Sequence, residues 1–130
     1  MSIFSSTFET SNESNLPINF NWISLQEIKQ LDEIIADSFI QPILLFKHST
    51  RCSISRMALK QFEKQFKTEE KVALYLLDLI AFRTISNEIA SRFDVEHQSP
   101  QILLLKKGKS VYNASHHQID AAIVLQHLIM

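Results

Sequence analysis

The chain has 130 residues, of which 45% are hydrophobic and 21% are charged, and its formal net charge is −1. This length and composition are typical of one globular domain that buries its own core. The near-neutral charge gives no electrostatic reason to expect nucleic acid or a membrane surface as a partner, and a single cysteine excludes an internal disulfide and a cysteine-rich zinc site.

Further absences narrow the function classes. The sequence has no run of 18 apolar residues and no basic segment followed by an apolar one near its start. We therefore expect neither a membrane span nor a signal peptide, and we expect a cytoplasmic, reducing location. The only glycine is Gly108, which excludes the glycine-rich loops that hold nucleotide phosphates.

Residues 1–20 are rich in Ser, Asn and Thr and predict a loosely ordered arm or a short edge strand. A single domain is expected over residues 21–130. Ser24 and Glu27 have the spacing of a capping box, and apolar residues recur at helical spacing after them. The sequence therefore predicts a first helix from Ser24 to about Ser38.

The next stretch combines a short strand with a second helix. Residues 43–47 are mostly apolar and follow Pro42, which predicts a buried strand. Beyond a few small polar residues, a helical pattern sets in, with one apolar face expected to cover the core. The residues of this face are Ile54, Met57, Ala58, Phe62 and Phe66.

Cys52 lies where this strand gives way to the helix. The first turn of a helix has unpaired N–H groups and a partial positive charge, which together stabilise a sulfur as the thiolate. Arg51 adds a neighbouring cation. The placement predicts a reactive cysteine. The alternative stays open, because free cysteines are also among the most buried and inert residues of protein cores.

The second half of the chain predicts a strand, a helix and a hairpin, followed by a last helix. Residues 72–79 form an apolar run, and Thr84 or Ser86 is placed to cap a helix with one apolar face. That face comprises Ile85, Ile89, Ala90 and Phe93. A loop over residues 95–101 leads to the hairpin.

The hairpin is predicted from residues 102–105, a turn and residues 110–115. Gly108 occupies the turn position that needs a positive φ. The chain then closes with a helix from Ile119, in whose first turn Asp120 is well placed.

This order of elements predicts an α/β fold. Strands joined by helices run parallel with right-handed crossovers, and the final hairpin adds an antiparallel edge. The expected architecture is a central mixed four-stranded sheet flanked by helices on both faces. With a cysteine directly after the first strand, this is the thioredoxin-like layout.

Two separated motifs resemble those of the monothiol bacilliredoxins, the YtxJ-like proteins of the bacillithiol redox system. The first is Lys47-His48-Ser49-Thr50-Arg51-Cys52-Ser53-Ile54-Ser55, which is similar to the K-H-S-T-x-C-P-I-S motif of that family. The second comprises Arg83, Ile85, Ser86, Ile89, Ala90, Phe93, Val95, His97, Ser99, Pro100 and Gln101. The resemblance covers roughly residues 20 to 115 in register.

The resemblance implies a monothiol thiol–disulfide oxidoreductase that removes bacillithiol, or a similar low-molecular-weight thiol, from protein mixed disulfides. Cys52 is its implied nucleophile. In thioredoxin-like folds the proline equivalent to Pro100 is cis and faces the cysteine, so Ser99 and Pro100 are expected to bind the thiol substrate. Further substrate-binding residues are expected beside the cysteine, namely His48, Thr50, Arg51, Ser53 and Ile54.

The same resemblance implies the partners. It implies no tightly bound cofactor, bacillithiol as co-substrate, S-thiolated proteins as substrates, a bacillithiol disulfide reductase and a monomeric state. One position departs from the motif, because Ser53 stands where the family has proline. His116 and His117 do not predict a metal site, since adjacent residues of a strand point to opposite faces.

Two alternatives remain from the residues alone. Cys52 can be a structural or ligand residue of a non-catalytic thioredoxin-like binding module, or of a monothiol protein that holds an iron–sulfur cluster between chains. His48 and His97 are either a proton donor and a binding group near Cys52, or a residue that ends a strand and points away and a solvated loop residue.

Overall fold

The computed structural model describes residues 20–130, so most of the arm predicted for residues 1–20 lies outside the described residues. In chain order, the elements are β1 (Ile23–Ser24), α1 (Lys29–Asp37), β2 (Ile43–His48), α2 (Ser53–Gln65), β3 (Ala73–Asp78), α3 (Arg83–Phe93), β4 (Gln101–Lys106), β5 (Lys109–Ser115), the short 3-10 helix η2 (His116–Gln118) and α4 (Ala121–Ile129). Within residues 20–130, no helix is long and apolar enough to cross a membrane.

The strands form one mixed sheet in the order β1-β3-β2-β4-β5. The strands β1 and β2 pair with β3 in parallel, whereas β4 is antiparallel to both β2 and β5. The prediction of four strands was wrong, because the sheet formed by residues 20–130 has five. The additional strand is β1, which has only two residues and lies at the edge of the sheet.

The predicted start of the first helix at Ser24 was also wrong. Ser24 pairs with Leu76 of β3, and the following N–H, that of Leu25, donates to the Leu76 carbonyl at 3.0 Å. The backbone here belongs to the sheet and is not available to a helix. The helix α1 begins only at Lys29, preceded by a turn in which the Gln30 side chain accepts hydrogen bonds from the backbone N–H groups of Gln26 and Glu27.

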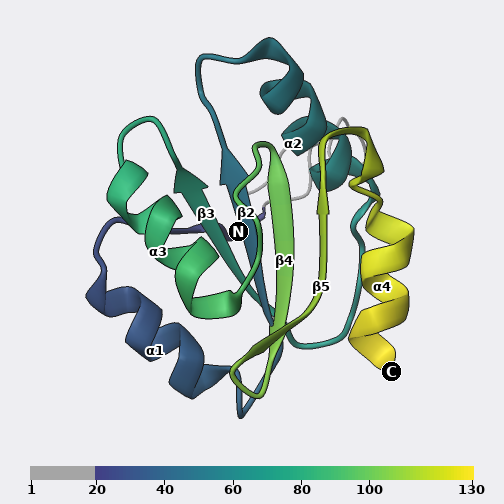
Figure 1. The fold of residues 1–130 in the computed structure, drawn as a ribbon. Coiled ribbons are helices and arrows are strands. Elements are labelled where there is room, and N and C mark those ends of the chain that lie inside the picture. The colour runs from purple at the N-terminus through teal and green to yellow at the C-terminus, as the bar shows by residue number, and fades with distance from the viewer. Residues whose placement is uncertain (1–19) are drawn as a thin grey trace, which may run out of the picture.

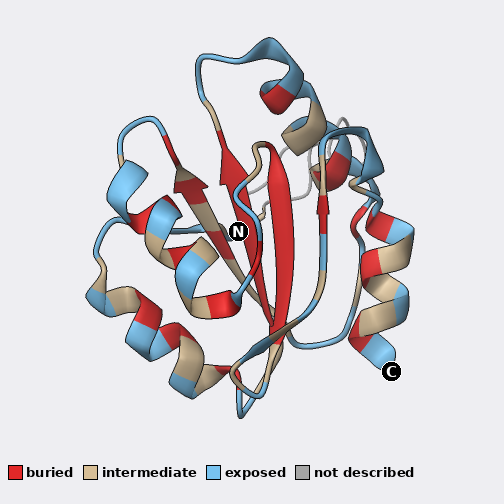
Figure 2. Ribbon diagram, viewed as in Figure 1, coloured by how far each residue is buried: buried red, intermediate tan, exposed pale blue. Residues whose placement is uncertain are grey.

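Helices cover both faces of the sheet, as predicted: α1 and α3 lie on one face, and α2 and α4 lie on the other (Figure 1). The central strands β2 and β4 are buried along almost their whole length (Figure 2). Each face has its own apolar cluster. The face of α1 and α3 is centred on Ile34, Leu45, Ile89 and Leu103, and the other face is centred on Phe46, Phe62, Leu104 and Val124.

Aromatic residues hold α2 against the sheet. The rings of Phe62 and Phe66 stack at a centroid distance of 4.9 Å, and Phe20 and Trp22 pack beside them. The indole Nε1 of Trp22 donates a hydrogen bond of 2.6 Å to the Glu63 carboxylate. These aromatic contacts fix the second half of the helix that follows Cys52 against the sheet.

The N-termini of α3 and α4 were predicted with different success. The helix α3 begins after Phe82, and neither Thr84 nor Ser86 is its N-cap, so that prediction was wrong. Ser86 is buried instead. The last helix was predicted, but α4 begins at Ala121, two residues later than expected, and Asp120 is its N-cap and not part of its first turn. The Asp120 carboxylate accepts a hydrogen bond of 2.9 Å from the Ala122 N–H.

The hairpin turn between β4 and β5 has the predicted geometry. Gly108 has a φ of +79° and Lys107 a φ of +52°, the left-handed conformations that a tight two-residue turn needs. A Cβ at Gly108 would also lie 3.3 Å from the Phe39 ring. Both the backbone conformation and the space favour glycine here.

Candidate functional site

Four chain segments meet at the carboxyl end of β2. Lys47 of β2 pairs with Gln101 of β4 in antiparallel register, so the loop that leaves β2 and the loop that enters β4 lie at the same end of the sheet. The start of the β3–α3 connection joins them, because Leu79 N–H donates to the His48 carbonyl at 3.0 Å. The 3-10 helix η2 is the fourth segment, since His116 N–H donates to the Pro100 carbonyl at 2.9 Å.

Cys52 is the N-cap of α2 and is an exposed, free thiol, so its predicted place at the junction of strand and helix is confirmed. Its N–H donates to the Ser49 carbonyl at 3.2 Å, and its carbonyl accepts from Arg56 N–H at 3.0 Å. The Arg56 side chain donates to the Thr50 carbonyl at 3.0 Å and so braces the loop. The thiol of Cys52 is therefore exposed to solvent on a short, hydrogen-bonded loop. This loop lies at a helix N-terminus, where the helix dipole favours an anion.

Behind the loop, Ser55 joins β2 to α2. Its hydroxyl lies 2.9 Å from His48 Nδ1 and accepts a 2.9 Å hydrogen bond from Ser49 N–H. Since the hydroxyl proton has no other partner among residues 20–130, it is best donated to Nδ1, which places the imidazole proton on Nε2. Burial lowers the pKa of His48 and so favours the neutral ring, although Asp78 opposes this shift.

A second polar group lies on the other side of β2. Lys47 is fully buried, and its ammonium donates to Gln101 Oε1 at 3.0 Å and to His97 Nδ1 at 2.9 Å. The hydroxyl of Ser86, on α3, is 3.1 Å from the same Nδ1. Burial lowers the pKa of Lys47 from 10.5 to about 8. Burial, Lys47 and Arg83 together lower the pKa of His97.

The Ser99–Pro100 bond is cis, as predicted. Pro100 is buried, and the Ser99 hydroxyl oxygen is also buried, with no hydrogen-bond partner among residues 20–130. This loop enters β4 beside β2, at the same end of the sheet as the Cys52 loop.

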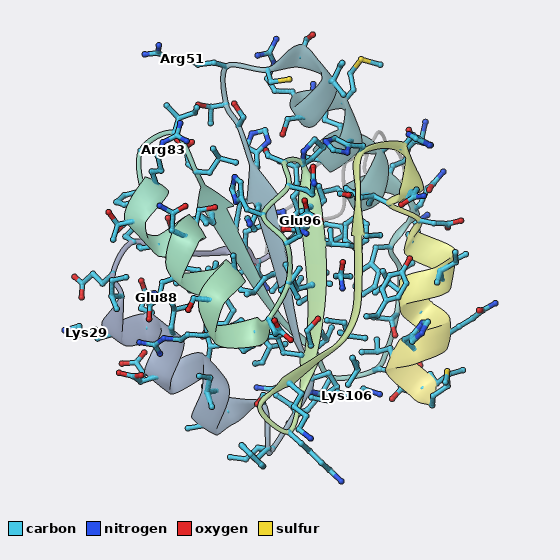
Figure 3. The ribbon with its side chains drawn as sticks, in the orientation of Figure 1. Lys29, Arg51, Arg83, Glu88, Glu96 and Lys106 are labelled. Atoms are coloured by element: carbon cyan, nitrogen blue, oxygen red, sulfur yellow. The ribbon has the colours of Figure 1, made fainter. Side chains whose placement is uncertain are left out.

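The other residues predicted to bind substrate divide into an exposed set and one buried residue. His48 is buried, with an exposed fraction of only 6%, so only a small part of its ring can meet a ligand. Arg51 extends outward from the Cys52 loop, and Arg83 lies near it at the same end of the molecule in this view (Figure 3). The exposed residues around Cys52 are Thr50, Arg51, Ser53 and Ile54. Their binding roles stay predictions.

The predicted apolar face of α2 was partly wrong. Phe62 and Phe66 are buried, but Ile54 and Met57 are 65% and 69% exposed. The face that packs on the sheet begins instead at Ser55, a polar residue that hydrophobic spacing does not detect. Ile54 and Met57 line a groove of about 290 Å³ together with His116, His117 and Ile119.

Four buried polar residues at the site were not predicted to take part in its chemistry, namely Lys47, Ser55, Ser86 and Gln101. Each belongs to one of the two motifs quoted above. A lysine at the end of an apolar strand was the clearest available signal, because lysine is almost never fully buried without a specific partner. His116 and His117 lie on the 3-10 helix η2 and not on a strand as assumed.

Comparisons with known proteins agree with this geometry. A family model described as "Monothiol bacilliredoxin BrxC" matches residues 23–124. A solved structure described as having a thioredoxin fold and suggested to be an oxidoreductase is 33% identical, with a TM-score of 0.70 over 80% of this chain and 90% of its own.

Two thioredoxins are more distant. The protein from Fasciola hepatica is 18% identical, with a TM-score of 0.60 over 82% of this chain and 95% of its own. Thioredoxin f from spinach chloroplasts is 15% identical, with a TM-score of 0.61 over 82% of each chain. These two similarities establish a thioredoxin fold and nothing further.

Proposed function

The chain belongs to the monothiol bacilliredoxin family of thioredoxin-fold thiol oxidoreductases, and we propose that it removes bacillithiol, or a similar low-molecular-weight thiol, from proteins that carry it as a mixed disulfide. The observation that carries the proposal is the position of Cys52. It is the chain's only cysteine, it is exposed, and it caps a helix at the end of the sheet where Ser99 and Pro100 also lie.

The proposed reaction has two exchange steps. The Cys52 thiolate attacks the sulfur of the small thiol, a new disulfide forms between them, and the protein leaves as a thiolate that takes a proton from water. A second small thiol, as its thiolate, then attacks the mixed disulfide on Cys52. This step releases the symmetric disulfide of the small thiol and restores the Cys52 thiolate. A bacillithiol disulfide reductase returns the disulfide to two thiols.

Residues around Cys52 give each part of the substrate a place to bind. Arg51 and Arg83 are exposed cations at this end of the molecule and suit the carboxylates of bacillithiol (Figure 3). Ser99 and Pro100 are the expected backbone platform for the attacked disulfide. The exposed Ile54 and Met57, with the groove beside them, suit the polypeptide that carries the modified cysteine.

Ser53 remains compatible with this chemistry. It is the first residue of α2 and is exposed. Unlike the proline of the family motif, it retains a backbone N–H at the helix terminus, where N–H groups lack intrahelical acceptors. This N–H is a potential donor to an anion beside Cys52. A monothiol reaction is expected, because serine supplies no second sulfur.

The experiment is release of the small thiol from a purified S-bacillithiolated protein, with S-glutathionylated protein as a parallel substrate. We expect the wild-type chain to release bacillithiol catalytically when free bacillithiol and its reductase are supplied, and Cys52→Ser to release none. Equal rates for the two variants would refute the proposal. Faster release of glutathione than of bacillithiol would keep the exchange reaction but reject bacillithiol as the preferred thiol.

A further inference from the structure

Lys47 is a feature of the site that the exchange reaction leaves unexplained. It is fully buried, and no carboxylate of residues 20–130 forms an ion pair with it. Removing an ammonium from water without an opposite charge costs stability, and a methionine of similar length would avoid this cost. Burial lowers the pKa of Lys47 only to about 8, so the group is still mostly cationic at pH 7. A stability argument alone does not account for a lysine here.

Within residues 20–130, the side-chain hydrogen bonds of Lys47 reach the loop that precedes β4 and the first residue of that strand. Its ammonium contacts His97 within this loop and Gln101 at its end, at 2.9 and 3.0 Å. The Gln101 amide nitrogen donates back to the Glu96 carbonyl at 3.0 Å. Ser99 and Pro100 lie between these attachment points. The ammonium of Lys47, on β2, therefore forms hydrogen bonds on both sides of Ser99 and Pro100, with His97 before them and Gln101 after them.

The strand that carries this ammonium also leads directly to the nucleophile. Lys47 is the penultimate residue of β2, and the loop that begins after His48 contains Cys52. The side chain of Lys47 thus connects the strand that positions Cys52 to the loop that positions Ser99 and Pro100. Hydrogen bonds from a charged donor are shorter and stronger than those between neutral groups, which suits a fixed link between two loops.

We propose that Lys47 is a positioning residue for thiol exchange: its buried ammonium fixes the 96–101 loop and thereby sets where Ser99 and Pro100 meet a substrate held at Cys52. This inference rests on the proposed function, because it assigns the loop to substrate binding. It predicts that loss of the ammonium weakens reactions that need the loop and spares reactions that need only the sulfur. Displacements of about 1 Å are enough to cost such a site much of its activity.

The test compares Lys47→Met with Lys106→Met. Lys106 is a matched control, because its ammonium lies at the other end of β4 and donates to backbone carbonyls at the end of α4, the shortest bond being 2.6 Å to His127. Three quantities are measured for each variant: kcat and KM with S-bacillithiolated protein, the alkylation rate of Cys52 by iodoacetamide, and amide hydrogen exchange of residues 96–99 and 101.

For Lys47→Met we expect kcat/KM to fall at least tenfold, mainly through a higher KM, with alkylation within twofold of wild type and faster hydrogen exchange in the loop. Lys106→Met is expected to keep kcat/KM within twofold. Should Lys47→Met fail to fold, Gln101→Ala cuts the same link from the loop side and is expected to lower kcat/KM at least threefold.

Unchanged loop exchange in a folded Lys47→Met chain would overturn the inference, and so would kcat/KM within twofold of wild type. A parallel loss of alkylation would overturn it as well, because the lysine would then act on the sulfur or on the whole fold. These outcomes are separable from failure of the proposed function, which would appear as a wild-type chain without exchange activity. The hydrogen-exchange measurement tests the link in that case too.

Discussion

Replacing Ser55 by alanine is predicted to destabilise the protein far more than its small change in size suggests. Ser55 is fully buried, and its hydroxyl is the partner of both His48 Nδ1 and Ser49 N–H, each at 2.9 Å. Alanine leaves these two groups without that partner. A buried polar group that loses its hydrogen bond costs about 1–3 kcal/mol.

The Ser49 N–H is only partly buried and can reach water, whereas the His48 ring is buried. We therefore place the combined loss at about 2–4 kcal/mol. For a domain of this length, 1 kcal/mol corresponds to roughly 3–5 °C in melting temperature, so the expected decrease is roughly 6–20 °C.

The matched control is Ser53→Ala, the same substitution two residues earlier in α2. Ser53 is exposed, so its replacement is expected to change the free energy of unfolding by no more than about 0.5 kcal/mol. Urea unfolding followed by the fluorescence of Trp22, the chain's only tryptophan, measures both variants. A loss below about 1 kcal/mol in Ser55→Ala, or a loss equal to that of Ser53→Ala, would refute the hydrogen-bonding role given to Ser55.

Two further predictions concern pH and the helix start. The pKa of Lys47 is about 8 in the folded chain, whereas its ordinary value is 10.5. Between these two pH values the unfolded chain binds more protons than the folded chain. The free energy of unfolding therefore rises with pH through this residue, by about 2 kcal/mol from pH 7.5 to 10. The difference between wild type and Lys47→Met, measured by urea unfolding at both pH values, isolates this slope, and a constant difference would contradict it. Ser53→Pro changes the first residue of α2 and is expected to leave the melting temperature unchanged or slightly higher, since proline fits that position. A decrease of more than roughly 4 °C in calorimetry would show that the Ser53 N–H or hydroxyl stabilises the folded chain.

Much of the architecture could be predicted from local patterns. Apolar runs predicted β2, β3 and β4, because buried strands require apolar residues. Gly108 predicted the hairpin turn, because a positive φ strongly favours glycine. The strand β1 could not be predicted, since two residues carry no period. Its partner, β3, is some fifty residues away, and only that pairing makes Ile23 and Ser24 a strand. The same sequence viewed locally looks like a capping box.

The candidate site divides in the same way. The position of Cys52 at the start of a helix could be predicted, because the pattern of apolar residues changes there from a short continuous run to helical spacing. The buried hydrogen bonds next to the Cys52 loop could not be predicted from the sequence. A hydrogen bond such as that between Lys47 and Gln101 joins residues that are distant in the sequence, so no regular spacing reveals it. Ile54 and Met57 have the period of a core face but are exposed, and Ser55 is buried in this turn instead. The start of α2 extends beyond the ends of the central strands, so little of the sheet lies beneath it (Figure 1).

The central claim, that Cys52 takes the small thiol from a protein, is tested most directly by the intact mass of the chain. The purified chain is mixed with an S-bacillithiolated protein in the absence of free thiol and reductase, so that the second exchange step is blocked. We predict that the wild-type chain gains the mass of one bacillithiol, located on Cys52 by peptide mapping, and that Cys52→Ser gains none. A wild-type chain that stays unmodified while its fold is intact would contradict the account.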